Sequence, residues 1–198
     1  MFPIYCVECR REGTWWCRAC RGTQKQSAHF FETPSPLNGL LAIWSYHSES
    51  PVGELIQQFK YNHSSAISEL WAEILPAELP VAVASASVVP VPLYSRRERE
   101  RGYNQAKIIG RFLAGKLQLP FIPDTLKRVR ATRQQARLSR LEREENVRGA
   151  FISRPAPSED VILVDDVFTT GATMGECAAA LKANGARRVF GFVLAKGE

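Results

Sequence analysis

Apolar and polar positions along the chain predict strands and helices in alternation, most clearly near the C-terminus. Val161 to Val164 form a run of four apolar residues, which is typical of a buried parallel strand. The following apolar residues recur with the spacing of one helix face: Met174, Cys177, Ala178 and Leu181. Gly185 is placed to cap this helix, and a second apolar run covers residues 189–195. The stretch therefore predicts a strand–helix–strand unit.

The same pattern recurs earlier in the chain. Residues 39–46 predict a strand, residues 52–61 a helix, and residues 88–93 a strand that ends as it reaches Pro92. Residues 106–113 carry the buried stripe of another helix. A further helix is predicted by apolar residues that share one face: Ile67, Leu70, Trp71, Ile74 and Leu75. This alternation predicts an α/β fold with a mostly parallel sheet flanked by helices.

Residues 1–36 differ from the rest because they contain two Cys-x-x-Cys pairs with seven residues between them: Cys6, Cys9, Cys17 and Cys20. Four thiolates at this spacing suit a tetrahedral Zn²⁺, whose binding would supply the folding energy that so short a stretch cannot obtain by burial. Two disulfides and an iron–sulfur cluster are the alternatives. We expect a structural zinc module, in which Trp15 and Trp16 serve for packing rather than for stacking on bases.

Pro34 and Pro36 interrupt all periodicity, which predicts a linker and two units, residues 1–36 and residues 37–198. The length of 198 residues allows one ordinary core and a small appendage. No apolar run is long enough for a membrane span, and the N-terminus lacks the order of a signal peptide. We therefore expect a cytoplasmic protein without membrane insertion.

The chemistry is concentrated directly after the apolar run that ends at Val164. Two carboxylates come first, Asp165 and Asp166. A loop of hydroxyls and one glycine follows before the helix: Thr169, Thr170, Gly171, Ala172 and Thr173. Such a loop suits a phosphate at a helix N-terminus, and the carboxylates suit a group rich in hydroxyls. Together they predict a phosphorylated sugar as ligand. The ATP-binding loop is excluded because no lysine follows the glycine.

The net charge of +6 is unevenly distributed, because residues 94–111 and residues 127–148 together carry +9. The first segment follows a predicted strand end, where open α/β sheets place ligands, and Arg101 is our preferred anion contact there. Residues 131–148 predict either a flap that closes over a polyanion or a charged surface helix. The candidate flap residues are Arg133, Gln135, Arg137, Arg140 and Arg143. The same residues would also suit the phosphate backbone of a nucleic acid.

Five motifs in this order resemble the ComF family of bacterial proteins, which are linked to natural competence and DNA utilisation. The motifs are the paired Cys-x-x-Cys head, Lys60-Tyr61, VPVPL with RERGYNQA, the set Thr132, Gln135, Arg143 and Asn146, and VILVDDVFTTGAT. The resemblance implies a type I phosphoribosyltransferase fold, with 5-phosphoribosyl 1-pyrophosphate (PRPP) and Mg²⁺ as ligands. The implied reaction transfers the phosphoribosyl group and releases pyrophosphate.

The resemblance also implies roles for individual residues. Asp165 and Asp166 would hold the ribose hydroxyls as the catalytic pair, and residues 169–173 would hold the 5′-phosphate. The pyrophosphate would face Pro92, Leu93, Tyr94, Arg101 and Lys60, although Lys60 is equally well explained as a solvated lysine. The alternative function is a non-catalytic PRPP sensor or single-stranded-DNA-binding protein. The implied partners are PRPP, single-stranded DNA and other competence proteins such as a helicase.

Overall fold

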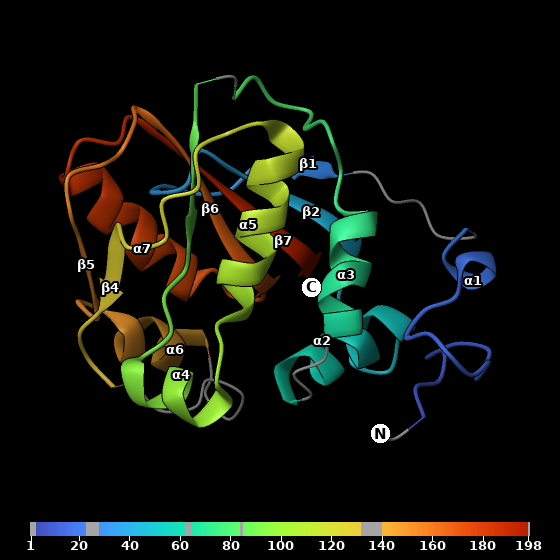
Figure 1. Cartoon of the computed structure of the whole chain (residues 1–198). Coiled ribbons are helices and arrows are strands. Elements are labelled where there is room, and N and C mark those ends of the chain that lie inside the picture. Colours follow the sequence, from blue (N-terminus) through green and yellow to red (C-terminus); the bar gives the residue numbers. More distant parts are fainter. Residues whose placement is uncertain (1–2, 23–27, 62–64, 84, 132–139, 198) are drawn as a thin grey trace.

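The structure is a computed structural model, and it describes residues 3–22, 28–61, 65–83, 85–131 and 140–197. Its centre is a five-stranded sheet of order β1-β2-β7-β6-β3 (Figure 1). The strands are β1 (His29–Phe31), β2 (Gly39–Ser45), β3 (Ser87–Pro90), β6 (Asp160–Phe168) and β7 (Arg188–Lys196). Only the edge strand β1 is antiparallel to its neighbour, and the other pairs are parallel. The expected α/β fold with a mostly parallel sheet is confirmed.

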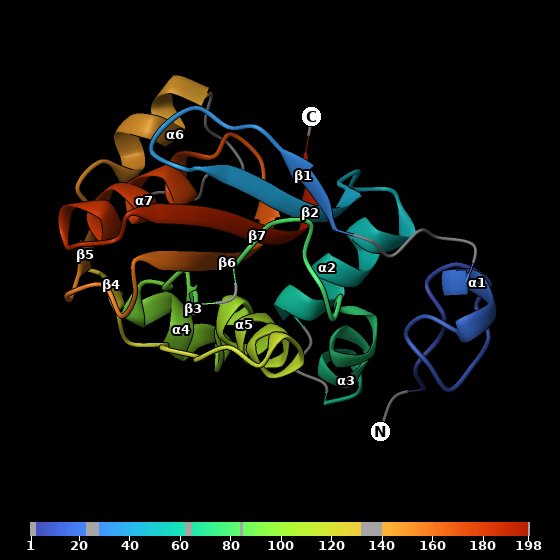
Figure 2. The ribbon, with the colours of Figure 1, turned by 90° about the horizontal axis from the view of Figure 1, so that it is seen from above.

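Helices flank both faces of the sheet (Figure 2). The helices of the described residues are α2 (Pro51–Tyr61), α3 (Ser65–Ile74), α4 (Ser95–Arg101), α5 (Gln105–Leu117), α6 (Arg140–Val147) and α7 (Ala172–Ala183), together with α1 (Arg18–Gly22), which lies to one side of the sheet. Because side chains alternate along a strand, Ile162 and Val164 join the core with α2, α3 and α5, whereas Val161 and Leu163 join the core with α7. All four are fully buried, and each such side chain contributes about 1.5–3 kcal/mol.

A small second sheet lies beside the main one and supports α6. Strand β4 (Leu126–Arg128) pairs antiparallel with β5 (Phe151–Ser153). Arg130, just beyond β4, donates hydrogen bonds to the carbonyls of Asn146 (3.3 Å) and Arg148 (2.6 Å), at and just beyond the C-terminus of α6. Of the two alternatives for residues 131–148, the part from residue 140 to residue 147 is a helix. Residues 132–139, which include Thr132, Arg133, Gln135 and Arg137, lie outside the described residues.

The N-terminal segment packs against the main sheet and its helices. Trp16 is buried, and its ring centroid lies 5.8 Å from that of Trp44 in β2, which confirms its packing role. Arg21 of α1 forms a 2.6 Å ion pair with Glu73 of α3. Strand β1 precedes residue 36 yet pairs with β2, so the main sheet recruits part of this segment. The division at residue 36 stays a prediction.

The ends of two strands, β6 and β3, differ from the prediction. β6 does not end at Val164 but continues to Phe168, because β7 pairs with it along that length. β3 ends at Pro90, before the predicted end near Pro92, although the Val91 N–H still donates to Val164 O of β6 at 2.8 Å.

Helix α7 ends as its sequence predicted. Gly185 has φ +106°, and its N–H donates to Lys182 O at 3.2 Å while the Ala186 N–H donates to Leu181 O at 3.1 Å. These two bonds satisfy carbonyls at the end of the helix, so the predicted cap is confirmed.

Among the described residues, no helix has the length and apolar character needed to cross a membrane.

Candidate functional site

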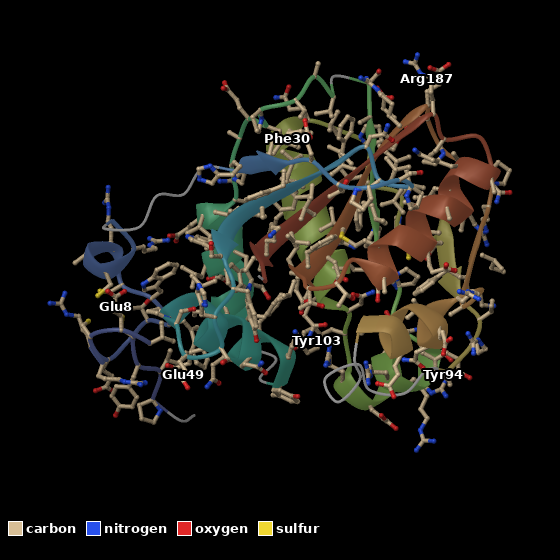
Figure 3. All side chains as sticks on the ribbon, turned by 180° about the vertical axis from the view of Figure 1, so that it is seen from behind. Glu8, Phe30, Glu49, Tyr94, Tyr103 and Arg187 are labelled. Atoms are coloured by element: carbon tan, nitrogen blue, oxygen red, sulfur yellow. The ribbon has the colours of Figure 1, made fainter. Side chains whose placement is uncertain are left out.

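The candidate site lies where the parallel strands β3 and β6 end. Carboxyl ends of parallel strands meet at one edge of the sheet, and ligands of open α/β sheets bind there. Residues 91–94 leave β3 at this edge and lead into α4, at whose start Tyr94 lies (Figure 3). Residues 169–171 leave β6 and lead into α7. Two loops that are distant in sequence therefore flank one edge of the sheet.

The acidic pair occupies the last part of β6, with its two side chains on opposite faces. Asp166 is buried, and its Oδ2 lies 3.2 Å from the Lys60 ammonium, which comes from the last turn of α2. Burial, the largest single effect, would lower the pKa of Lys60, but the charge and hydrogen bond of Asp166 and the charge of Asp165 together outweigh burial and raise it. Lys60 is therefore a partly buried partner of Asp166 and not a solvated surface lysine.

Asp165 is half-buried and lies on the opposite face of β6 from Asp166. Its Oδ1 accepts a 2.9 Å hydrogen bond from the backbone N–H of Asp166. Burial, and then the neighbouring charge of Asp166, raise the pKa of Asp165 to about 7. A carboxyl group that titrates near neutral pH can exchange protons with a ligand under ordinary conditions.

The TTGAT loop has the geometry of an anion-binding helix start. Gly171 precedes α7 with φ +80°, and a Cβ there would lie 2.6 Å from Phe168 Cζ, so only glycine fits. Thr170 Oγ1 lies 3.5 Å from the Ala172 N–H. The first N–H groups of a helix and its dipole favour a negative group, and the loop and first turn contain three threonines.

A pocket of about 150 Å³ lies beside α4 and β4. It is lined by Tyr94, Arg96, Arg97, Glu100, Arg128 and Ala131. Arg96 is paired with Glu100 at 2.8 Å, and the Arg128 guanidinium lies 5.2 Å from the ring centroid of Phe151. Burial lowers the pKa of Arg128, and the charge of Arg97 lowers it further. Two arginines that repel one another in a pocket would be stabilised by a multiply charged anion.

Arg97 and Arg128 were not singled out from the sequence, where each was one of several cations in a basic segment. A signal was present for Arg128, because strand alternation places it on the same face as the buried Leu126. Arg101 was preferred instead, but the residues that line the pocket do not include it. Its Nη1 donates a 2.7 Å hydrogen bond to Gln105 Oε1.

The four cysteines of the N-terminal segment converge. Their sulfur atoms all lie within 4.8 Å of one another, and the Cys9 and Cys17 sulfurs are 3.7 Å apart. A tetrahedral zinc with bonds of about 2.3 Å places its sulfurs about 3.8 Å apart, whereas a disulfide requires about 2 Å. The cluster can therefore hold a metal ion such as zinc, and a multi-iron cluster would need wider spacing.

The protonation states of the cysteine thiols also favour binding of a cation to the cluster. Burial would raise the pKa of Cys6, but backbone N–H groups, first that of Cys17, lower it to about 6. The hydrogen bond with Cys17 raises the pKa of Cys20 instead. In the absence of a cation, these thiols cannot all ionise together, whereas a bound metal ion stabilises all four thiolates.

Comparison with known proteins identifies the family. Competence protein F of Haemophilus influenzae is 32% identical over 198 residues, covering 95% of this chain and 82% of that protein. The DNA utilization protein YhgH of Salmonella typhi is 35% identical over 165 residues, covering 80% and 72%. The chain belongs to the ComF family. No protein-family model matches it.

Solved structures similar to this ComF-family chain include two adenine phosphoribosyltransferases. The enzyme from Leishmania tarentolae has a TM-score of 0.43 and 13% identity, covering 86% of this chain and 95% of that one. The enzyme from Trypanosoma brucei, solved with AMP, pyrophosphate and ribose-5-phosphate, has a TM-score of 0.38 and 12% identity, covering 90% and 79%.

Within the ComF-family chain, the structure brings some of the sequence-predicted residues together. The Lys60 ammonium lies 3.2 Å from Asp166, and residues 169–173 follow the acidic pair after two intervening residues. Pro92, Leu93 and Tyr94 lie in the loop after β3. Arg140 and Arg143 lie in α6, and their role as flap residues stays a prediction.

Proposed function

We propose that this ComF-family protein binds PRPP and, if catalytic, transfers its 5-phosphoribosyl group to an acceptor with release of pyrophosphate. The observation that carries the proposal is the pairing of two carboxylates, Asp165 and Asp166, with the TTGAT loop that follows in the same strand–helix connection. The loop offers N–H groups and hydroxyls to a 5′-phosphate. The carboxylates offer acceptors to the two ribose hydroxyls.

The diphosphate of PRPP would lie in the arginine pocket. Arg97 and Arg128 supply guanidinium groups there, and Tyr94 supplies a hydroxyl. Arginine forks match phosphate oxygens in pairs, and two such groups suit a leaving group that gains charge as its bond to C1 breaks. This proposal adds Arg97 and Arg128 to Arg101, which the sequence had favoured and whose contact with the anion stays a prediction.

Magnesium fits the donor set in part, because carboxylate oxygens are ligands that Mg²⁺ prefers. Asp166 Oδ2 already holds the Lys60 ammonium, which leaves Asp165 as the carboxylate nearer to a metal carried by the diphosphate. Mg²⁺ bound there would neutralise charge on the leaving pyrophosphate. The acidic pair itself would stabilise positive charge on the ribose as the bond from C1 to the diphosphate breaks.

The names of the relatives suggest where the reaction or binding is used. The relatives are named for competence and for DNA utilization. We therefore propose a role in the uptake or utilisation of DNA, with other competence proteins such as a helicase as candidate partners; the cytoplasmic location stays a prediction from the sequence. The cysteine cluster would serve as a structural zinc module.

The experiment that tests catalysis measures pyrophosphate release. The protein would be incubated with Mg²⁺ and PRPP, alone and with nucleobases or oligonucleotides as acceptors. Release that depends on an acceptor would support a transferase. Binding of PRPP without release would support the second candidate, a PRPP sensor.

A single-stranded-DNA-binding role is favoured by a separate observation, the +9 charge of residues 94–111 and 127–148. Binding of this kind releases counterions, so affinity should fall steeply as salt rises. Replacing Arg137, Arg140 and Arg143 by glutamine should reduce both affinity and salt dependence. An oligonucleotide that fails to bind at low salt would eliminate this role.

A further inference from the structure

The motif RGYNQ lies at a junction between the candidate site and α2. Gly102 ends α4 with φ +81°, which turns the chain so that Tyr103 faces α2 (Figure 3). Tyr103 is buried and its hydroxyl donates to the carbonyl oxygen of Phe59. Gln105 Nε2 donates to the same oxygen at 3.4 Å. The Phe59 carbonyl oxygen therefore accepts hydrogen bonds from two side chains of a distant segment.

The Phe59 carbonyl lies next to Lys60 at the end of α2. Phe59 lies in the last turn of α2, where carbonyls have no partner within the helix. The next residue is Lys60, whose ammonium lies 3.2 Å from Asp166. Fixing the Phe59 carbonyl fixes the backbone from which Lys60 extends.

Packing and further hydrogen bonds immobilise the two donors. The ring centroids of Tyr103 and Phe59 lie 6.0 Å apart, and those of Phe59 and Trp71 lie 5.7 Å apart. Gln105 Oε1 accepts from Arg101 at 2.7 Å, which fixes the orientation of its amide. Asn104 caps α5 through the Ala106 N–H and donates to Val91 O at 3.0 Å. The segment is thus tied to α4, to α5 and to the loop after β3.

We propose that Tyr103 and Gln105 are positioning residues that fix the last turn of α2 and so hold Lys60 against Asp166. The effect on ligand affinity rests on the proposed function, because it supposes that the acidic pair binds PRPP. The mechanical part does not, since it concerns only the contact between Lys60 and Asp166. The two parts are tested separately.

The mechanical part is tested by the reactivity of the Lys60 amine. The full-length protein would be labelled with a trace of acetic anhydride, and acetylation would be read by peptide mass spectrometry with the exposed Lys127 as internal reference. Tyr103→Phe should raise Lys60 labelling about threefold or more, as Asp166→Asn does, because about 1 kcal/mol of hydrogen bonding is lost. Gln105→Met should act in the same direction.

A matched control is available beside Lys60. The Tyr61 side chain is 76% exposed, so Tyr61→Phe removes the same hydroxyl group without touching the junction. Equal Lys60 labelling in wild type, Tyr103→Phe and Gln105→Met would overturn the proposal. If Tyr103→Phe failed to fold, its circular dichroism spectrum would show this, and Gln105→Met would then decide.

The ligand part is tested by a double-mutant cycle on PRPP–Mg²⁺ affinity. Tyr103→Phe should weaken binding about fivefold in the wild-type background and less than twofold in a Lys60→Met background. Equal losses in both backgrounds would show that Tyr103 acts independently of Lys60 and would overturn the proposed coupling. If the wild type bound no PRPP, the proposed function would fail, while the labelling experiment would still decide the positioning role.

Discussion

The Lys60 ammonium lies 3.2 Å from Asp166 Oδ2, and the side chains are only 23% and 12% exposed. This contact joins the end of α2 to the end of β6 at the edge of the sheet where the loop after β3 also lies. A largely buried ion pair of this kind is costly to break, because one charge would be left without a partner. The pair therefore fixes the geometry of the acidic site before any ligand arrives.

Asp165 should make stability depend on pH. Its folded-state pKa of about 7 exceeds the ordinary 3.8, so the folded state holds the proton more tightly, and stability falls as pH rises from about 4 to 7. Asp165→Asn removes this loss and should be more stable than wild type by about 2 kcal/mol at pH 8. The difference should shrink at pH 4.

Denaturant unfolding at several pH values measures this effect. Asp124→Asn, at an exposed position in the loop before β4, is the control for a change of net charge. A stability difference between wild type and Asp165→Asn that stayed constant from pH 4 to pH 8 would be incompatible with a raised pKa at Asp165.

Gly171 should tolerate no side chain. Gly171→Ala places a Cβ 2.6 Å from Phe168 Cζ at φ +80° and should cost about 1–2 kcal/mol while weakening phosphate binding. Gly175→Ala, one turn later in α7, is the matched control, since its Cβ meets only Pro36 Cδ at 3.9 Å. That variant should gain up to about 1 kcal/mol. Thermal unfolding and calorimetry with ribose-5-phosphate check both variants, and equal behaviour would contradict the account of the loop.

Arg97 and Arg128 should contribute to binding of the diphosphate of PRPP but not to binding of the 5′-phosphate. Arg128→Met should weaken PRPP–Mg²⁺ binding about tenfold or more, because it removes charge-assisted hydrogen bonds. Binding of ribose-5-phosphate, which lacks the diphosphate, should change little. Arg97→Met should behave alike, whereas Arg99→Met, exposed on the same helix, should leave both affinities unchanged. An equal loss of affinity for the two ligands would show that the arginine pocket does not bind the diphosphate.

The cysteine cluster should hold one zinc ion per chain. Cys9→Ser should lower the zinc content measured by mass spectrometry and reduce the melting temperature, because metal binding supplies folding energy to this segment. Cys177→Ala changes a buried cysteine of α7 outside the cluster and should keep the zinc. Purified protein with iron and sulfide in place of zinc would refute the assignment.

Periodicity predicted most of the fold because its elements are long and one face of each is buried. The helix starting near Met174 and the strand from Val189 to Ala195 were found to within two residues. The short strands β1 and β5 were missed, since three residues carry no period and only pairing with a neighbour stabilises them. The extension of β6 to Phe168 was likewise set by its partner β7.

The candidate site was predictable where one contiguous stretch contains it. Asp165, Asp166 and the TTGAT loop were identified by residue type and order. The ion pair of Lys60 was not, because it joins segments more than one hundred residues apart and depends on how α2 ends. The roles of Tyr103 and Gln105 were hidden for the same reason, since a polar side chain that serves a distant carbonyl resembles any surface residue in the sequence.

The most direct test of the proposed PRPP site is calorimetric titration of PRPP with Mg²⁺ into wild type and the double variant Asp165→Asn, Asp166→Asn. Circular dichroism would first establish that the variant is folded. We predict that the wild type binds and that the double variant shows no measurable binding, because the ribose hydroxyls lose both carboxylate acceptors. Unchanged affinity in the folded double variant would contradict the assignment of the site.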